Sequence, residues 1–172
     1  MRQLDTVERK IHAVVDSMKE DVAYLFMNWA QANVAISQIE KPTIVYVLPP
    51  SGNMKFTYAR VYDHPETQIG FLAPTEFDFE GDKNDGIIEA MKRLAVKFVN
   101  KLNESEYFEC IEGSVPYQVV YDYLDQNTTG VIITLKLEEV DGISICDDSY
   151  SRKMKSTFTD EYDDTYTKVK DK

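Results

Sequence analysis

The sequence predicts an α+β fold: a long N-terminal helix, a mostly antiparallel sheet with a second helix inserted between strands, and helices packed on one face of the sheet. Three patterns predict this class. Apolar residues recur every three or four positions from about 5 to 36, a β-branched run follows at Thr43–Leu48, and a helical pattern at about 86–102 interrupts the strands. Strands on both sides of that helix favour an α+β arrangement with helices covering the sheet.

The first helical pattern is longer than a compact domain needs. Asp5 and Glu8 have the spacing of a capping box at its start. Thirty residues at 1.5 Å each would span roughly 45 Å. The helix therefore either breaks near Lys19–Asp21 or projects beyond its domain, where another subunit would cover it. Its apolar stripe consists of Val7, Ile11, Val14, Met18, Val22, Leu25, Trp29, Ala32 and Ile36.

The remaining elements follow from alternation and turn signals. Between the helices we expect strands at Thr43–Leu48, from Met54 to about Tyr62 (with Phe56 and Tyr58 alternating) and, more weakly, at Gln68–Ala73, with a turn at Asp63–Glu66. The second helix begins near Asn84 or Asp85, either of which can cap it. After it we expect strands at Tyr107–Ile111, Tyr117–Leu124, Val131–Leu137 and Ile143–Cys146.

Charge divides the chain into a domain and a tail. The chain has 172 residues and a net charge of -11, and 43% of it is hydrophobic, which is enough to bury one core. Residues 147–172 hold seven acidic and six basic residues and few apolar ones, so residues 1–146 carry -10. We therefore expect a single domain at 1–146 and a polar tail at 147–172 that is flexible or ordered on a partner subunit. Its candidate anchors are Tyr150, Phe158, Tyr162 and Tyr166.

Composition excludes several classes of function. A chain this acidic lacks the basic stripe of a protein that grips nucleic-acid phosphates. No stretch approaches the roughly 18 apolar residues of a membrane span, and the N-terminus has no apolar segment typical of a secretory signal. Cys110 and Cys146 are expected to be free, buried thiols in strands, which suits a reducing cytosol or a particle assembled there.

The most acidic stretch is Thr75–Glu89, which suggests a test for calcium binding. Asp78, Glu80, Asp82 and Glu89 occupy positions 1, 3, 5 and 12 of an EF-hand register. Lys83, however, stands at the sixth position, where the loop needs glycine. A solvated acidic loop is the favoured interpretation. An enzyme that uses this loop to attract a divalent cation remains an alternative.

No other pattern predicts catalysis, a cofactor or a metal. His12 is interpreted as a flank of the first helix and His64 as an exposed turn residue, so neither forms a zinc site. Tyr117, Tyr121 and Tyr123 lie beside aspartates rather than the basic residues of a base-stacking platform, which favours core or subunit-interface packing. We therefore expect no catalytic residue, no cofactor and no metal ligand, and the chain is predicted not to be an enzyme.

The order of elements, together with the segment Pro116–Leu137 and the following Ile145-Cys146, resembles the tail-terminator and neck-completion proteins of tailed phages. The likeness covers about residues 5–146 and extends to the ring proteins of crAss-like phages. It implies a non-enzymatic virion protein of the neck or tail, assembled in the host cytoplasm as a homo-oligomeric ring that joins head to tail. Implied partners are further copies of the chain, the portal and neighbouring ring or tail proteins, with DNA passing through and no membrane.

Two features suit that role. An acidic loop facing the lumen would repel DNA phosphates and let the duplex pass. The tail anchors would contact neighbouring subunits. The loop residues are Glu76, Asp78, Glu80, Asp82 and Asp85. The alternative is a small acidic secretion-type chaperone, a dimer whose sheet receives an extended client segment.

Overall fold

The computed structural model describes residues 6–75, 82–125 and 127–144. The elements are α1 (Val7–Ser17), β1 (Ala23–Met27), α2 (Trp29–Ile36), β2 (Thr43–Val47), β3 (Ser51–Phe56), β4 (Arg60–Pro74), α3 (Asp82–Glu104), β5 (Tyr117–Tyr123), β6 (Thr128–Lys136) and β7 (Ile143–Ser144). The α+β class and the mostly antiparallel sheet are confirmed. Among the described strands, β1 and β2 form the one parallel pair.

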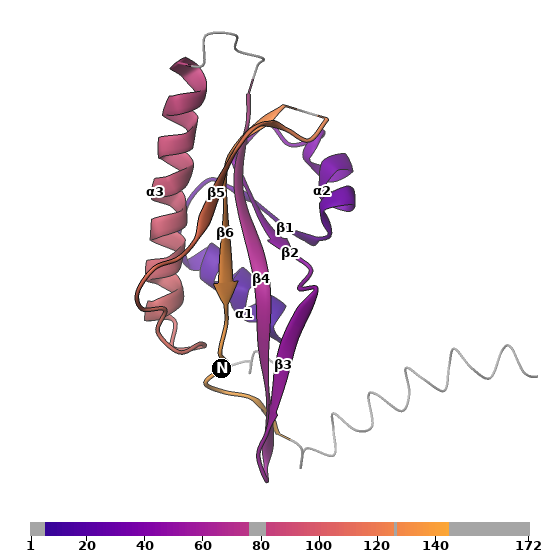
Figure 1. Ribbon diagram of the computed structural model, residues 1–172, viewed down its shortest axis with the longest axis vertical. Helices are drawn as coiled ribbons and strands as arrows, with labels where there is room; N and C mark the ends of the chain where they lie inside the picture. The colour runs from indigo at the N-terminus through magenta and orange to yellow at the C-terminus, as the bar shows by residue number, and fades with distance from the viewer. Residues whose placement is uncertain (1–5, 76–81, 126, 145–172) are drawn as a thin grey trace, which may run out of the picture.

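The sheet is organised around β4, a strand of 15 residues that runs most of the length of the molecule (Figure 1). The strand order is β1-β2-β4-β6-β5, and β3 and β7 pair with β4 at its N-terminal end. The turn predicted at Asp63–Glu66 is wrong, because these residues pair with β3 and the strand continues through them. Pro65 is accommodated because the residue opposite it on β3 is Gly52, which has no side chain. A Cβ at position 52 would lie only 2.9 Å from the Cα of Pro65.

The long N-terminal helix is also wrong, since α1 has 11 residues. Of the two sequence alternatives, the break near Lys19 is the one that occurs: the helix ends at Met18 and Lys19 has a positive φ of 54°. The apolar spacing continues beyond the break into β1, which pairs with β2. A capping box formed by Asn28 and Gln31 then starts α2.

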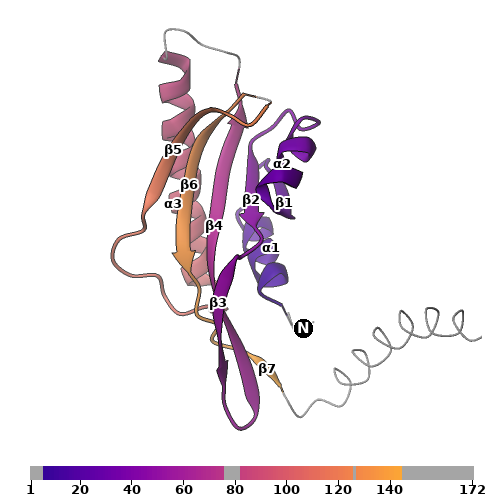
Figure 2. The same ribbon diagram turned by 45° about the vertical axis from the view of Figure 1, so that its right-hand side comes forward.

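Helices cover both faces of the sheet, so the prediction that they share one face is wrong for α2. The larger core lies between the sheet and the helices α1 and α3, and it encloses Phe71, Phe98 and Tyr46. On the opposite face, α2 packs Ala32 and Ile36 against the sheet. Figures 1 and 2 show α3 and α2 on opposite sides of the strands.

The second helix is confirmed but starts earlier than predicted, at Asp82. Asn84 is therefore inside the first turn, where its buried Oδ1 accepts hydrogen bonds from Thr75 at 2.9 Å and Thr129 at 3.4 Å. The strand predicted at Tyr107–Ile111 is reduced to a single bridge between Phe108 and Glu139. Cys110 follows it in irregular chain and is exposed, so the prediction of a buried thiol in a strand is wrong for this residue.

Candidate assembly interface: the β3–β4 arm

The lower end of the molecule is a β-hairpin that buries little. We call residues 51–66 the arm: it consists of β3 and the part of β4 that pairs with it, from Ser51 opposite Glu66 to Phe56 opposite Val61 (Figure 2). All six residues of β3 are exposed. A two-stranded hairpin with no packed face is marginally stable in water. The arm is therefore held by its connection to the rest of the sheet, by the pairing of Arg60 and Val61 with β7 and by a hydrogen bond from Asp63 to Glu139.

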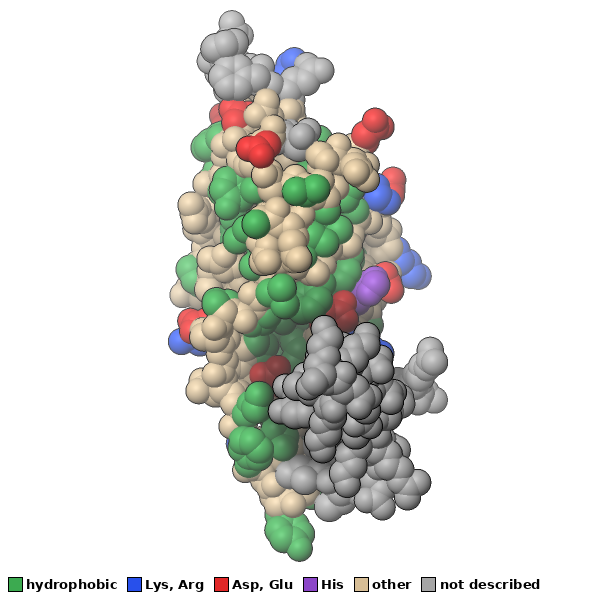
Figure 3. Space-filling view, turned by 90° about the vertical axis from the view of Figure 1, so that its right-hand side faces the viewer, with side chains coloured by type: hydrophobic (Ala, Val, Ile, Leu, Met, Phe, Trp, Pro, Cys, Tyr) green, Lys and Arg blue, Asp and Glu red, His purple; other side chains and the backbone are tan. Residues whose placement is uncertain are grey.

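The arm carries three of the most exposed large apolar side chains among the described residues. Met54 and Phe56 are each 69% exposed, and Tyr58 at the turn is fully exposed. Met54 and Phe56 lie two residues apart, so they point to the same face of the strand. Figure 3 shows hydrophobic side chains reaching the lower end of the molecule, where the arm lies. Apolar side chains grouped on a projecting element are typical of a protein–protein contact.

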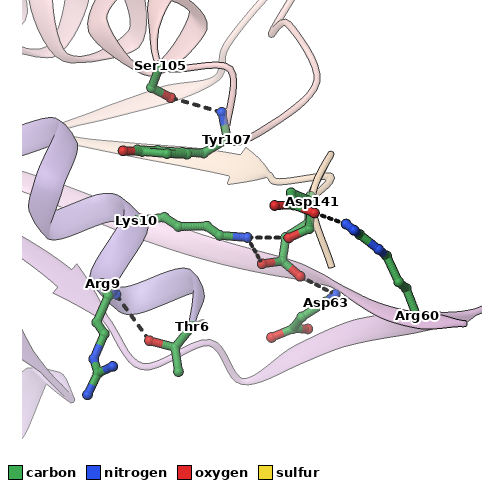
Figure 4. Close-up of polar contacts among 9 residues, drawn as sticks. Thr6, Arg9, Lys10, Arg60, Asp63, Ser105, Tyr107 and Asp141 are labelled. Carbon is green, nitrogen blue, oxygen red and sulfur yellow. Dashed lines mark hydrogen bonds and ion pairs between the residues drawn. The ribbon is translucent and has the colours of Figure 1, made fainter. Parts of the chain in front are cut away.

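A buried ion pair fixes the root of the arm to α1. Lys10 Nζ donates to Glu139 Oε1 at 2.6 Å and to the Asp141 carbonyl at 2.7 Å (Figure 4). The other carboxylate oxygen of Glu139 accepts from the backbone N–H of Asp63 in β4 at 2.7 Å. Arg60 pairs with the Asp141 carboxylate nearer the arm's tip. These contacts tie the arm to two separate parts of the chain.

The same region shifts the ionisation of nearby groups. Burial, and next the negative charge of Glu139, raise the pKa of the Asp63 carboxyl. Burial and the charge of Asp63 likewise raise the pKa of Tyr46 on the neighbouring strand. Both shifts disfavour the negatively charged form. Asp63 therefore carries an electrostatic penalty at neutral pH that the Lys10 contacts to Glu139 do not remove.

No family model matches this chain, and comparisons with curated proteins and with solved structures give no match. Among the described helices, none is both long and apolar enough to cross a bilayer. What the arm contacts must therefore be inferred from the surfaces of the protein itself.

The far edge of the sheet carries two hollows that meet at Val115. The first is a groove of about 330 Å³ between α3 and β5–β6, lined mainly by apolar side chains that include Val96 and Tyr117. The second, of about 690 Å³, lies beside β6 and is lined by loop 109–116. Its charged lining residues are Glu66, Glu109, Glu112, Lys136 and Glu138. We call the two hollows together the acceptor edge.

The acidic residues predicted to face a lumen are only partly placed. Residues 82 and 85 both lie in the first turns of α3, where the positive end of the helix dipole stabilises the negative charge of Asp85. Glu76, Asp78 and Glu80 lie outside the described residues. The segment from Asp82 to Glu89 is helical, which does not fit the second half of an EF-hand loop. Across the described ranges, no three His, Cys, Asp or Glu side chains group as a metal site.

The other predicted residues are scattered. His12 lies on α1, as predicted, where it is exposed and stacks on Tyr24 with 4.5 Å between ring centroids. His64 lies within β4 rather than in an exposed turn, and it is half-buried with no hydrogen bond to Nε2 among the described residues. Tyr123 packs edge-on against Trp29 at 5.6 Å. Tyr117 and Tyr121 are 58% and 55% exposed, so core packing is wrong for both.

The tail anchors Tyr150, Phe158, Tyr162 and Tyr166 lie outside the described residues. The exposed arm differs from the prediction, because the alternation of Met54, Phe56 and Tyr58 predicts a half-buried strand. One signal for an exposed arm is present, since β3 opens with Ser-Gly-Asn, three residues that are poor at packing in a strand. The arm and the acceptor edge together can form protein contacts.

Proposed function

We propose that this protein is a non-enzymatic structural subunit of a tailed bacteriophage, which assembles as a homo-oligomeric ring in the neck or tail and joins head to tail. The observation that carries the proposal is the arm. Its exposed Met54, Phe56 and Tyr58 place three large apolar side chains on one projecting element, which is typical of a protein–protein contact. The partners are further copies of the chain, the portal and adjacent ring or tail proteins.

The arrangement of the sheet supports a ring rather than a closed pair. Strand β3 of the arm lies on the β2 side of β4, whereas the acceptor edge lies on the β6–β5 side. Two different surfaces on opposite edges favour a head-to-tail contact, which makes a ring when the rotation between subunits closes. An isologous dimer would instead use one surface twice.

The charge supports a passage for DNA. The chain carries -11, and the acidic stretch that ends in the first turns of α3 is its most negative part. In the proposed ring, Glu76, Asp78, Glu80, Asp82 and Asp85 face the lumen and repel phosphates, so the duplex passes without being held. Residues 147–172 contact a neighbouring ring through Tyr150, Phe158, Tyr162 and Tyr166.

A secretion-type chaperone is the second candidate, and the acceptor edge favours it. An apolar groove beside the open edge of β5 is suited to an extended client segment that adds a strand. This candidate predicts a dimer whose acceptor edge is free for the client.

Electron microscopy of the purified full chain separates the two candidates. The ring proposal predicts closed particles with a central lumen, and antibodies against the chain that label the neck or tail of a phage that encodes it. A homogeneous dimer without a lumen would support the chaperone and contradict the ring. Label confined to the host cell and absent from finished particles would contradict the virion role.

A further inference from the structure

We propose that the arm of one copy adds to the acceptor edge of the next copy as an extra strand. Met54 and Phe56 then fill the apolar groove, and Lys55 faces the glutamates of loop 109–116. This inference deepens the proposed function and rests on its self-assembly. The arm contact itself is tested separately from ring closure and from a phage context.

The arm cannot occupy the acceptor edge of its own chain. All six β3 residues are paired with β4. Leu137 N–H bonds to the Pro65 carbonyl, and Glu109 N–H bonds to the Glu138 carbonyl, so the chain around 137–139 and then residue 109 lie beyond β4. Three strand spacings put β3 roughly 14 Å from residue 109. An arm that reaches this edge must therefore come from another molecule.

The two faces of the arm match the two hollows. Met54 and Phe56 pair with Asp63 and Val61, which share the sheet face of Ile69 and Phe71, the face covered by α1 and α3. A sheet that continues into a second copy keeps its faces, so these side chains arrive on the α3 side, where the groove lies. Lys55 points to the opposite face, the side on which Glu66 and Lys136 line the larger hollow.

Charge favours the same alignment. Residues 51–60 contain Lys55 and Arg60 and no acidic residue. Residues 104–112 contain Glu104, Glu106, Glu109 and Glu112 and no basic residue. Arg60 is paired within the chain, but no carboxylate of the described residues pairs with Lys55. Lys55 is therefore the cation available for a second copy.

Strand direction is compatible with a repeated contact. β3, β4, β6 and β5 are antiparallel in succession, so β3 runs opposite to β5. Two copies in the same orientation therefore bring β3 antiparallel to β5. The N-terminal half of β5, Tyr117–Val120, pairs regularly with β6, whereas the register shifts between Val120 and Tyr123. The regular half lies next to the groove and offers an open edge for a further strand.

Complementation between two blocked variants tests the contact. Phe56→Asp blocks the arm and leaves the acceptor edge intact, whereas Val96→Asp, at a position 61% exposed in the groove, does the reverse. We expect each variant alone to be monomeric. We expect their mixture to give a one-to-one dimer that does not grow, because one productive contact remains. Val34→Asp on α2 is the control, since Val34 is as exposed as Phe56 and lies on neither surface.

A charge exchange tests the role of Lys55 in the same mixed dimer. Lys55→Glu in the arm donor should weaken the dimer roughly tenfold. Changing Glu109 and Glu112 to Lys in the acceptor partner should recover most of that loss. Recovery requires that the two sets of charges face each other, so weakening without recovery would contradict the placement of Lys55.

A disulfide trap gives an answer even if a blocked variant is poorly folded. In a Cys146→Ser background, Lys55→Cys should crosslink to the native, exposed Cys110 of another copy. Within one chain the two positions are too far apart for a disulfide, which needs Cα atoms within about 7 Å. Crosslinks that persist after Cys110→Ser would show arm-to-arm contact and overturn the proposal.

Other results also overturn it. A mixture of the two blocked variants that stays monomeric, or a Phe56→Asp variant that assembles like the wild type, contradicts the arm contact. If deleting residues 147–172 turns a monomer into an oligomer, the tail covers the arm, and the proposed occupant is wrong. The inference and the proposed function can also be told apart. If the mixed dimer forms, but the wild type makes open chains and antibodies do not label phage particles, the arm contact is supported and the proposed function is contradicted.

Discussion

Lys10 in α1 donates a hydrogen bond of 2.6 Å to Glu139, although 129 positions separate the two residues in the chain. Both side chains are almost fully buried, at 3% and 2% exposed. Because Glu139 also accepts from the backbone N–H of Asp63, this one carboxylate joins the N-terminal helix to the root of the arm.

Breaking this ion pair should therefore be costly. Lys10→Met leaves a buried carboxylate without its cation, which typically costs about 3–5 kcal/mol of folding free energy. Urea unfolding followed by circular dichroism measures the loss. Lys41→Met is the matched control, because it breaks an exposed pair with Asp21 and should cost about 1 kcal/mol or less. Equal losses from the two variants would contradict the structural role of the buried pair.

Asp63→Asn should stabilise the protein at neutral pH. The pKa of Asp63 is raised, first by burial and then by Glu139, above the ordinary value of 3.8. At pH values between the pKa of Asp63 in the unfolded chain and its higher pKa in the folded protein, the folded state binds more protons. The free energy of unfolding therefore falls as pH rises through this range, and the loss is constant at higher pH. The amide removes this penalty. Unfolding midpoints from pH 3 to 8 should show an advantage at neutral pH that disappears in acid; an advantage independent of pH would contradict this cause.

Gly130→Ala should unfold the protein or nearly so. Gly130 lies in β6 directly beside β4, where an added Cβ would meet the Phe71 carbonyl oxygen at 2.0 Å. That atom is backbone and cannot move away without disrupting the sheet. Gly86→Ala is the matched control: nothing lies within 4 Å of its Cβ position in α3, and removing a helical glycine should gain up to about 1 kcal/mol. Thermal unfolding compares the two, and a folded Gly130→Ala with a wild-type midpoint would contradict this packing.

The sequence predicted individual elements well where local pattern and burial agree. Thr43–Val47 is a strand with every residue buried, and its β-branched run predicts that without tertiary information. The helix α3 keeps its apolar face against the sheet for most of its length. The prediction of one long N-terminal helix was wrong because Val22, Leu25 and Trp29 continue the helical spacing by coincidence. Residues 23–27 instead form a strand, since they pair with β2.

The arm and the acceptor edge could not be predicted in the same way. Met54 and Phe56 alternate as buried strand residues do, and only the three-dimensional structure shows that none of the described helices covers that end of the sheet. The Lys10–Glu139 pair joins distant parts of the chain, and no local sequence pattern predicts such a contact. A contact between residues far apart in the chain depends on how all the strands and helices are arranged, and a local sequence pattern does not contain that information.

The mass of the protein in solution tests most directly whether the arm drives self-assembly. Sedimentation velocity should show a multi-subunit species for the full wild-type chain. The variant Met54→Ser/Phe56→Ser/Tyr58→Ser should be a monomer with an unchanged unfolding midpoint, since these side chains are exposed and contribute little to the core. A wild-type chain that is monomeric, or a triple variant that keeps the wild-type mass, would contradict the account.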